Sequence, residues 1–248
     1  MRALSWSPSG RHLASASEDG RILIRKAESG EVEVGPINAN QSRVFSVAYS
    51  PSGDRIASGG RNISIWDSHT GGLLVGPIQA NVTSVVWSLD GSKLYSGRYH
   101  FTCVFDSTSG TELHRFQDDH FLYSIALSPK HNLLAAVGSQ GIAHLWDAES
   151  YQPLGLPFHQ EDAEGLQWVS FSPNGRYLAY GGRNKKIILR IVNDNALELA
   201  VRATNPLDAT QQEVIPESHN VSILAFNTLS SSQNHRRSMP SILWHSQQ

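Results

Sequence analysis

The stretch VFSVAYSPSGDRIASGGRNISIWD, residues 44–67, shows most clearly the pattern from which the fold is inferred. It contains three short apolar runs with β-type alternation, separated by two turns that contain glycine. Pro51-Ser52-Gly53 predicts a tight turn, because proline presets its backbone angle and glycine adopts positive φ. In the third run, Ile63 and Ile65 alternate with Ser64 and Trp66, so apolar bulk points to both faces. The stretch therefore predicts strands that are covered on both sides.

The same unit is found in five copies along the chain. Each copy begins at a serine that precedes a turn, and the spacings between successive copies are 43, 38, 40 and 44 residues. A period of roughly 40–45 residues with four short strands per repeat is typical of propeller blades. The five starts are Ser7-Pro8-Ser9-Gly10, Ser50-Pro51-Ser52-Gly53, Ser88-Leu89-Asp90-Gly91, Ser128-Pro129-Lys130-His131 and Ser172-Pro173-Asn174-Gly175.

A Trp-Asp pair ends the third strand of two copies. The pairs are Trp66-Asp67 and Trp146-Asp147, and Phe105-Asp106 occupies the same place in a third copy. With these pairs and this repeat, residues 1–203 resemble the WD40 repeat family. The resemblance implies an all-β propeller of four-stranded antiparallel blades, whose usual activity is to hold other proteins. The expected blades are residues 1–39, 40–80, 81–117, 118–160 and 161–203.

Residues 204–248 lose the repeat. Their composition predicts a polar linker, followed by a degenerate sixth blade around the strand-like segment VSILAF at residues 221–226. Propellers have about 4–8 blades, and five recognisable blades with a fragment predict a ring that is not fully closed. An open blade face favours pairing with another chain, so self-association through the blade ends is a further expectation.

The resemblance also implies a buried hydrogen-bond relay of His, Ser or Thr, Asp and Trp in well-preserved blades. In the fourth copy His120 and Trp146 are present, but Gln140-Gly141 stands where the Asp is expected. No copy carries all the members. We therefore expect an incomplete relay and a less rigid propeller, because a buried polar network loses value when members are missing.

Composition excludes several classes of protein. The net charge of −2 provides no cationic field for nucleic acid or an anionic membrane, and the single cysteine, Cys103, excludes an intrachain disulfide. No apolar run approaches the ~20 residues that span a bilayer, and the first residues lack the apolar core of a secretory signal. We expect a cytoplasmic protein, with a nuclear location left open, and neither nucleic acid nor membrane as a partner.

Motifs for catalysis are absent from the sequence. GxxxxGK[ST], HExxH and GxSxG do not occur, and the histidines show no ligand spacing. We predict a non-catalytic scaffold for protein interaction, without catalytic residues, metal or cofactor. One alternative is a propeller hydrolase or lyase, which requires clustered carboxylates with raised pKa values. Another is the ligand-sensing fragment of a larger NTPase-linked receptor, because GEVEVGPINAN and GGLLVGPIQAN resemble the WD40 arrays of NACHT-type receptors.

Three arginines follow a glycine in the turn between the second and third strands of three copies: Arg61, Arg98 and Arg183. In the resembled fold these turns share one rim with the segments that lead into each first strand. Guanidinium groups on one rim would bind an acidic or phosphorylated peptide in bidentate fashion. The alternative is that they are only solvated turn residues. The predicted partner-binding residues are Arg43, Arg61, Arg98, Tyr99, His120, Phe121 and Arg183.

Overall fold

The computed structural model describes residues 1–39, 43–98, 101–117, 120–130, 132–155, 157–159, 165–183 and 186–192. All described strands belong to one compact unit, Met1–Gln212. The second unit, Glu213–Gln248, lies outside the described residues, as do the predicted linker and the predicted sixth blade. The described residues contain no α-helix, and one 3-10 turn, η1 (Ser139–Gly141), joins two strands.

The described strands form five antiparallel sheets, which we call blades one to five in chain order. Blade one contains β1 (Ala3–Trp6), β2 (His12–Ala16), β3 (Arg21–Lys26) and β4 (Val32–Asn38). Blade two contains β5 (Val44–Tyr49), β6 (Arg55–Gly60), β7 (Asn62–Asp67) and β8 (Leu73–Gln79). Blade three contains β9 (Val82–Trp87), β10 (Lys93–Arg98), β11 (Phe101–Asp106) and β12 (Glu112–Gln117). Blade four contains β13 (Leu122–Leu127), β14 (Leu133–Gly138), β15 (Ile142–Asp147) and β16 (Phe158–His159). Blade five contains β17 (Leu166–Phe171), β18 (Tyr177–Gly182) and β19 (Ile187–Ile191).

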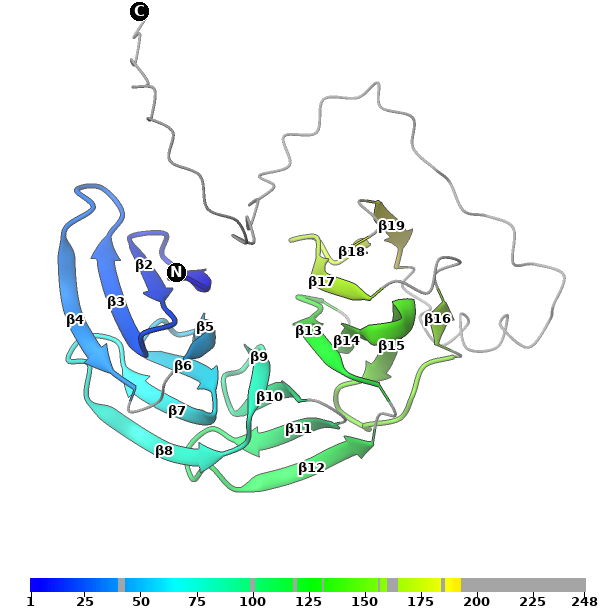
Figure 1. Ribbon diagram of the computed structural model, residues 1–248, viewed down its shortest axis with the longest axis horizontal. Coiled ribbons are helices and arrows are strands. Elements are labelled where there is room, and N and C mark those ends of the chain that lie inside the picture. Colours follow the sequence, from blue (N-terminus) through cyan, green and yellow to red (C-terminus); the bar gives the residue numbers. More distant parts are fainter. Residues whose placement is uncertain are drawn as a thin grey trace, which may run out of the picture. The chain divides into compact units, whose positions relative to one another are not determined.

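The blades follow one another with their first strands on the inner side. Figure 1 shows β5, β9, β13 and β17 around a common centre and β4, β8 and β12 at the periphery. Successive first strands contact one another from β1 to β17. This is the arrangement of propeller blades that the repeat predicts. The predicted outer strand of blade five, at residues 197–202, lies outside the described residues.

Blade two is covered on both faces by its neighbouring blades, as the alternation in residues 44–67 predicts. Ile63 and Ile65 of β7 are 0 % and 1 % exposed and pack with Val82 and Val85 of blade three. On the opposite face, Trp66 belongs to the cluster that blade two shares with blade one. The apolar core is therefore divided into layers between neighbouring sheets, and no blade buries its residues alone.

Serine hydroxyls connect successive first strands. Ser46 Oγ accepts a hydrogen bond from the Val85 backbone N–H of the next blade at 3.1 Å. Serines occupy the same position in blades three and four. Ser84 Oγ accepts a hydrogen bond from the Ile125 N–H, and Ser124 Oγ accepts one from the Val169 N–H, both at 3.4 Å. The serine at this position thus accepts a hydrogen bond from a backbone N–H on the inner edge of the next blade, where that blade has no further strand to pair with.

The turn that marks each repeat has the predicted geometry. Gly53 adopts φ of 79°, in the left-handed region that glycine favours. Ser50 Oγ accepts from the Arg55 N–H at 3.1 Å, and Ser88 Oγ accepts from the Lys93 N–H at 2.8 Å. The serine therefore completes the hydrogen bonding of the turn, which explains why each repeat begins with one.

The array of described strands is not closed by hydrogen bonds. The sheet of blade five and the sheet of blade one share no paired strand among the described residues. This agrees with the expectation of incomplete closure. It leaves the far face of blade five without a neighbouring blade among the described strands.

The Asp that ends the third strand, in the Trp-Asp pair of blade two and the Phe-Asp pair of blade three, holds the turn that leads to the outer strand. Asp67 Oδ1 accepts from the Thr70 N–H at 2.7 Å and from Thr70 Oγ1 at 2.9 Å. Asp106 Oδ1 accepts in the same way from the Ser109 N–H at 2.7 Å and from Ser109 Oγ at 2.9 Å. These bonds hold the pKa of both carboxyl groups below the ordinary value of an Asp side chain. The hydrogen bond from the backbone N–H has the largest effect in each case.

These carboxylates predict that the protein loses stability in acid. A pKa that is lower in the folded state means stability that is complete above the unfolded pKa of about 4 and is lost as pH falls below it. Hydrogen bonds from the Ser88 hydroxyl, and then from Ser92, lower the pKa of Asp90 to about 2. The loss of stability therefore continues to about pH 2. We expect the melting temperature to be constant near neutral pH and to fall from about pH 5 toward pH 2.

Asp106→Asn is the matched variant for this prediction. The amide removes the titrating group, so the melting temperatures of the variant and the wild type should converge as pH falls. Parallel curves for the two proteins between neutral and acid pH would show that the Asp106 turn does not contribute to acid sensitivity.

Candidate functional site

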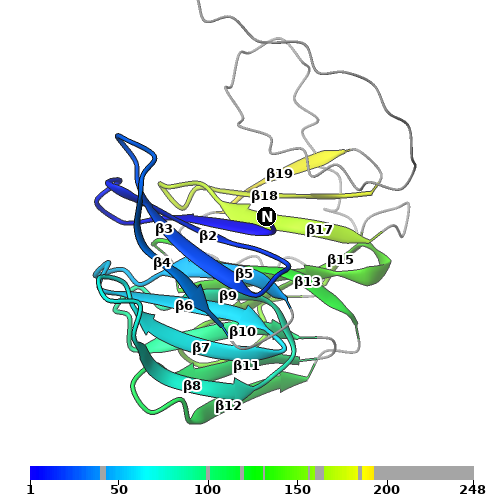
Figure 2. The same ribbon diagram turned by 60° about the vertical axis from the view of Figure 1, so that its left-hand side comes forward.

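The strand order places the predicted arginines on one rim. In a four-stranded antiparallel blade, the turn between the second and third strands lies at the same end as the start of the first strand. Arg61 lies in the turn between β6 and β7, Arg98 ends β10, and Arg183 follows β18. Figure 2 shows the strands running between two ends of the unit, so these turns gather at one of them. The three arginines come from blades two, three and five.

The three side chains differ in exposure. Arg61 and Arg183 are exposed, whereas Arg98 is half-buried. Arg98 also contributes, after Arg115, to holding the pKa of Glu112 below its ordinary value. The charge of Arg98 is therefore partly compensated within blade three, and Arg61 and Arg183 are the more accessible cations.

Arg43 lies on the segment that leads into β5. Its Nε is 3.9 Å from Glu18 Oε1, and Arg2 also pairs with this carboxylate. The Arg43 side chain is 60 % exposed. It shares the rim, since the start of each first strand lies there, but Glu18 competes for its charge.

His120 and Phe121 lead into β13 and are half-buried. Phe121 donates its N–H to Ser139 Oγ at 3.1 Å, and the Ser139 N–H donates to the Phe121 carbonyl at 2.8 Å. This pair of bonds ties the lead-in segment to the 3-10 turn η1. The His120 ring lies 6.0 Å from the His144 ring. Tyr99, the remaining predicted residue, lies outside the described residues.

Backbone bonds connect the rim turns to the next blade. The Arg61 carbonyl accepts the Asn81 N–H at 2.9 Å, and Asn81 leads into β9. Arg61 is therefore held between blades two and three by its backbone, while its side chain extends to solvent. Such a placement presents a cation on a rigid support, which suits recognition of an anionic group.

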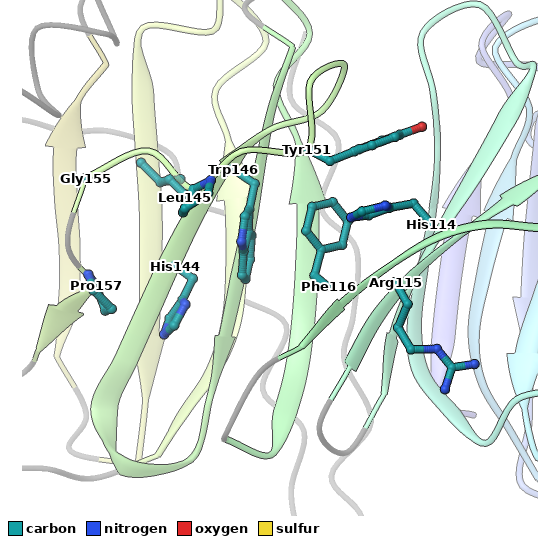
Figure 3. A pocket seen from close by; sticks show the side chains of 10 residues that line it. His114, Arg115, Phe116, His144, Leu145, Trp146, Tyr151, Gly155 and Pro157 are labelled. Carbon is teal, nitrogen blue, oxygen red and sulfur yellow. The ribbon is translucent and has the colours of Figure 1, made fainter.

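Blades three and four enclose a pocket that the sequence did not indicate. Its volume is about 410 Å³. Figure 3 shows Phe116 and His114 on one side and Trp146 and His144 on the other. The wall is aromatic: the His114 and Tyr151 rings stack at 4.4 Å, and the Phe116 and Trp146 rings are 5.4 Å apart.

The pocket exists because the outer strand of blade four is short. β16 contains two residues, whereas β12 of blade three contains six. Pro153 and Pro157 line the pocket beside the outer edge of β15, and proline has no N–H for a longer ladder. These two prolines were the available signal in the sequence. Its lining combines the aromatic rings with the polar side chains of His114, Arg115 and His144.

The described residues contain no cluster of metal-ligating side chains, and their one cysteine is buried. No group of three or more His, Cys, Asp or Glu side chains in the described part of the chain could hold a metal ion. Cys103 is 3 % exposed, and burial raises the pKa of its thiol. A buried thiol with a raised pKa is a poor nucleophile. In the same described residues, no helix has the length and apolar character to cross a membrane.

Comparison with known proteins agrees with the repeat. The family model described as "WD domain, G-beta repeat" matches residues 1–25, 32–67 and 110–147. A guanine nucleotide-binding protein subunit beta of Solanum tuberosum is 27 % identical over 205 residues, which are 72 % of this chain and 52 % of that protein. A subunit beta-1 of Nicotiana tabacum is 25 % identical over 202 residues, 73 % of this chain and 53 % of that protein.

A periodic tryptophan protein 2 homolog of Caenorhabditis elegans is 23 % identical over 223 residues, which are 79 % of this chain and 24 % of that protein. The chain therefore spans between about a quarter and about half of the length of these relatives.

Proposed function

Because the chain belongs to the WD40 repeat family, we propose that it is a non-catalytic scaffold that binds another protein through its arginine-bearing rim. The observation that carries this proposal is the recurrence of a Gly-Arg turn at one rim of blades two, three and five. Repetition of one cation at equivalent turns of three blades concentrates positive charge there, whereas Glu18 and Asp19 occupy the corresponding turn of blade one. An acidic or phosphorylated peptide is the partner chemistry that fits this surface.

The rim supports binding without requiring a deep cavity. Arg61 and Arg183 are exposed, and Arg98 lies between them in chain order at the same rim. An extended peptide that crosses several blades meets the arginines one after another. Each solvent-exposed ion pair contributes little alone, about 0.2–1 kcal/mol, so binding requires several of them together. This favours a peptide with several acidic groups over a single anion.

A charge-reversal variant tests this proposal. We expect Arg61→Glu/Arg98→Glu/Arg183→Glu to weaken binding of a fluorescent Glu-rich probe peptide by about thirtyfold or more, since three lost pairs amount to about 2 kcal/mol. Binding is measured by fluorescence anisotropy, and it should weaken as salt concentration rises. A phosphorylated version of the probe tests whether phosphate strengthens the interaction.

The opposite rim provides a matched control. Arg11, Lys130 and Arg176 are exposed cations in the turns between first and second strands. Changing all three to Glu alters the net charge by the same amount as the rim variant. We expect this control to bind the probe almost as well as the wild type. Equal loss of binding in both triple variants would show that only net charge matters and would contradict a specific rim.

A further inference from the structure

One carboxylate on the arginine-bearing rim is held by two arginines of the chain itself. Glu18 lies in the turn between β2 and β3, at the end of blade one where the first strand begins. Its Oε1 pairs with Arg2 Nη2 and lies 3.9 Å from Arg43 Nε. Arg2 precedes β1 and Arg43 precedes β5, so the segments that lead into two successive blades converge on one acidic side chain.

Backbone hydrogen bonds hold both arginines next to this turn. The Arg2 N–H donates to the Ala16 carbonyl at 2.8 Å. Val44, which follows the other arginine, donates its N–H to the Ser17 carbonyl at 3.2 Å. Both acceptors belong to the two residues before the acidic side chain. The two guanidinium groups therefore lie beside the turn because the backbone places them there, whichever carboxylate they bind.

The three charged side chains are accessible to solvent. Arg2, Glu18 and Arg43 are 47 %, 51 % and 60 % exposed. The hydrogen bond from Arg2, with smaller contributions from the charges of both arginines, holds the pKa of the Glu18 carboxyl below its ordinary value. Exposed ion pairs of this kind are weak. A carboxylate from solution can therefore compete with Glu18 for the same two arginines.

The neighbouring acid, Asp19, makes different contacts. Its Oδ1 accepts hydrogen bonds from the Ser17 hydroxyl and, at 3.2 Å, from the Arg21 N–H. Its Oδ2 lies 3.7 Å from Arg21 Nε. Asp19 is thus bound to residues of its own hairpin, whereas Glu18 reaches across to both lead-in segments. The two acids carry the same charge in the same turn but engage different arginines.

We propose that Arg2 and Arg43 form a carboxylate-binding site at the blade-one end of the rim, and that Glu18 occupies this site as an internal competitor of the acidic partner. The proposal rests on the proposed function, because the partner is the acidic peptide of the rim. Arg43 and Arg61 both belong to blade two, so a peptide that extends from Arg61 toward blade one presents its next acidic group to this site. Two guanidinium groups can bind that group with charge-assisted hydrogen bonds once Glu18 is displaced. Glu18 thus limits the affinity of the rim for the peptide.

Fluorescence anisotropy with the Glu-rich probe peptide measures this competition on the full chain. Glu18→Gln removes the charge and keeps the size of the side chain, so both arginines become available to the probe. We expect the dissociation constant to fall by about threefold to tenfold, as for one or two additional exposed ion pairs. The gain should shrink as salt concentration rises, because exposed pairs are screened.

Asp19→Asn is the matched control for this variant. It removes the same charge from the same turn, and the amide oxygen still accepts the hydrogen bonds of the hairpin. We expect Asp19→Asn to bind the probe within about twofold of the wild type, since it releases neither Arg2 nor Arg43 and acts only through screened charge. Equal strengthening in the two variants would show that only net charge matters and would overturn the proposal.

A second substitution identifies where the gain arises. In the Glu18→Gln background, Arg43→Gln should cancel most of the gain, and Arg2→Gln should do the same. In the wild type, Arg43→Gln should change binding by less than about twofold, because Glu18 already engages that arginine. An equal effect of Arg43→Gln in both backgrounds would contradict internal competition.

The outcomes separate this proposal from the proposed function. If the wild type binds the probe through Arg61, Arg98 and Arg183 but Glu18→Gln binds no more tightly, only the internal competition is wrong. If Glu18→Gln binds the probe and the wild type does not, the competition is supported in its strongest form. If neither protein binds the probe, both proposals are wrong.

Discussion

Replacing Trp66 with alanine is expected to lower the free energy of unfolding by about 3–5 kcal/mol, as for other large core truncations. Trp66 is 5 % exposed and packs in the cluster that includes Ile22 and Ile24 of blade one. Its Nε1 donates to Ser58 Oγ at 2.9 Å. The variant thus leaves a cavity between two blades and removes a partner of a buried hydroxyl. Urea denaturation measures the loss.

Two variants separate the contributions of Trp66. Trp66→Phe keeps most of the packing but leaves Ser58 without the indole N–H, so it should lose about 1–3 kcal/mol. Trp6→Ala is the exposed control, because Trp6 is 59 % exposed. Surface changes of this kind stay within about 0.5 kcal/mol. If Trp66→Ala lost no more stability than Trp6→Ala, the layered core between blades one and two would be wrong.

Replacing Arg55 with alanine is expected to cost about 2–3 kcal/mol, because charged hydrogen bonds and a cation–π contact are lost together. Arg55 lies on β6 and reaches into blade three. Its Nη1 donates to Ser107 Oγ at 3.3 Å, and its Nη2 donates to the Gly91 carbonyl at 3.3 Å. The guanidinium group also lies 5.1 Å from the centre of the Trp87 ring. The side chain is only 24 % exposed, so solvent screens these contacts little.

Arg55→Lys and Arg21→Ala are the controls for this contact. Lysine keeps the charge but cannot present a planar fork to Ser107 and Gly91 together, so an intermediate loss is expected. Arg21 is 64 % exposed and pairs with Asp19 on the surface, so its removal should change stability by less than about 0.5 kcal/mol. Equal losses in Arg55→Ala and Arg21→Ala, measured by urea denaturation, would show that Arg55 does not join the blades.

The strands of each repeat could be predicted because their signals are local. The alternation in residues 44–67 and the glycine at the turn gave β5, β6 and β7 to within two residues of their ends. The serine bonds between blades could not be predicted in the same way. Ser46 and Val85 are 39 residues apart in sequence, and only the packing of neighbouring blades brings them together.

The sequence predicts at which end of the blades the three arginines lie, but it does not predict which side chains surround them. Antiparallel order alone puts Arg61, Arg98 and Arg183 at one end of their blades. That Arg98 is half-buried and lies within the electrostatic reach of Glu112 depends on side chains of β12, which no local pattern reveals.

Hydrogen–deuterium exchange with the Glu-rich probe peptide tests the binding rim most directly. We expect slower exchange at residues 60–62 and 182–183 in the presence of the peptide, with no change at residues 8–11 and 173–176 of the opposite rim. Protection of the opposite rim, or of neither rim at a peptide concentration that saturates binding, would contradict it.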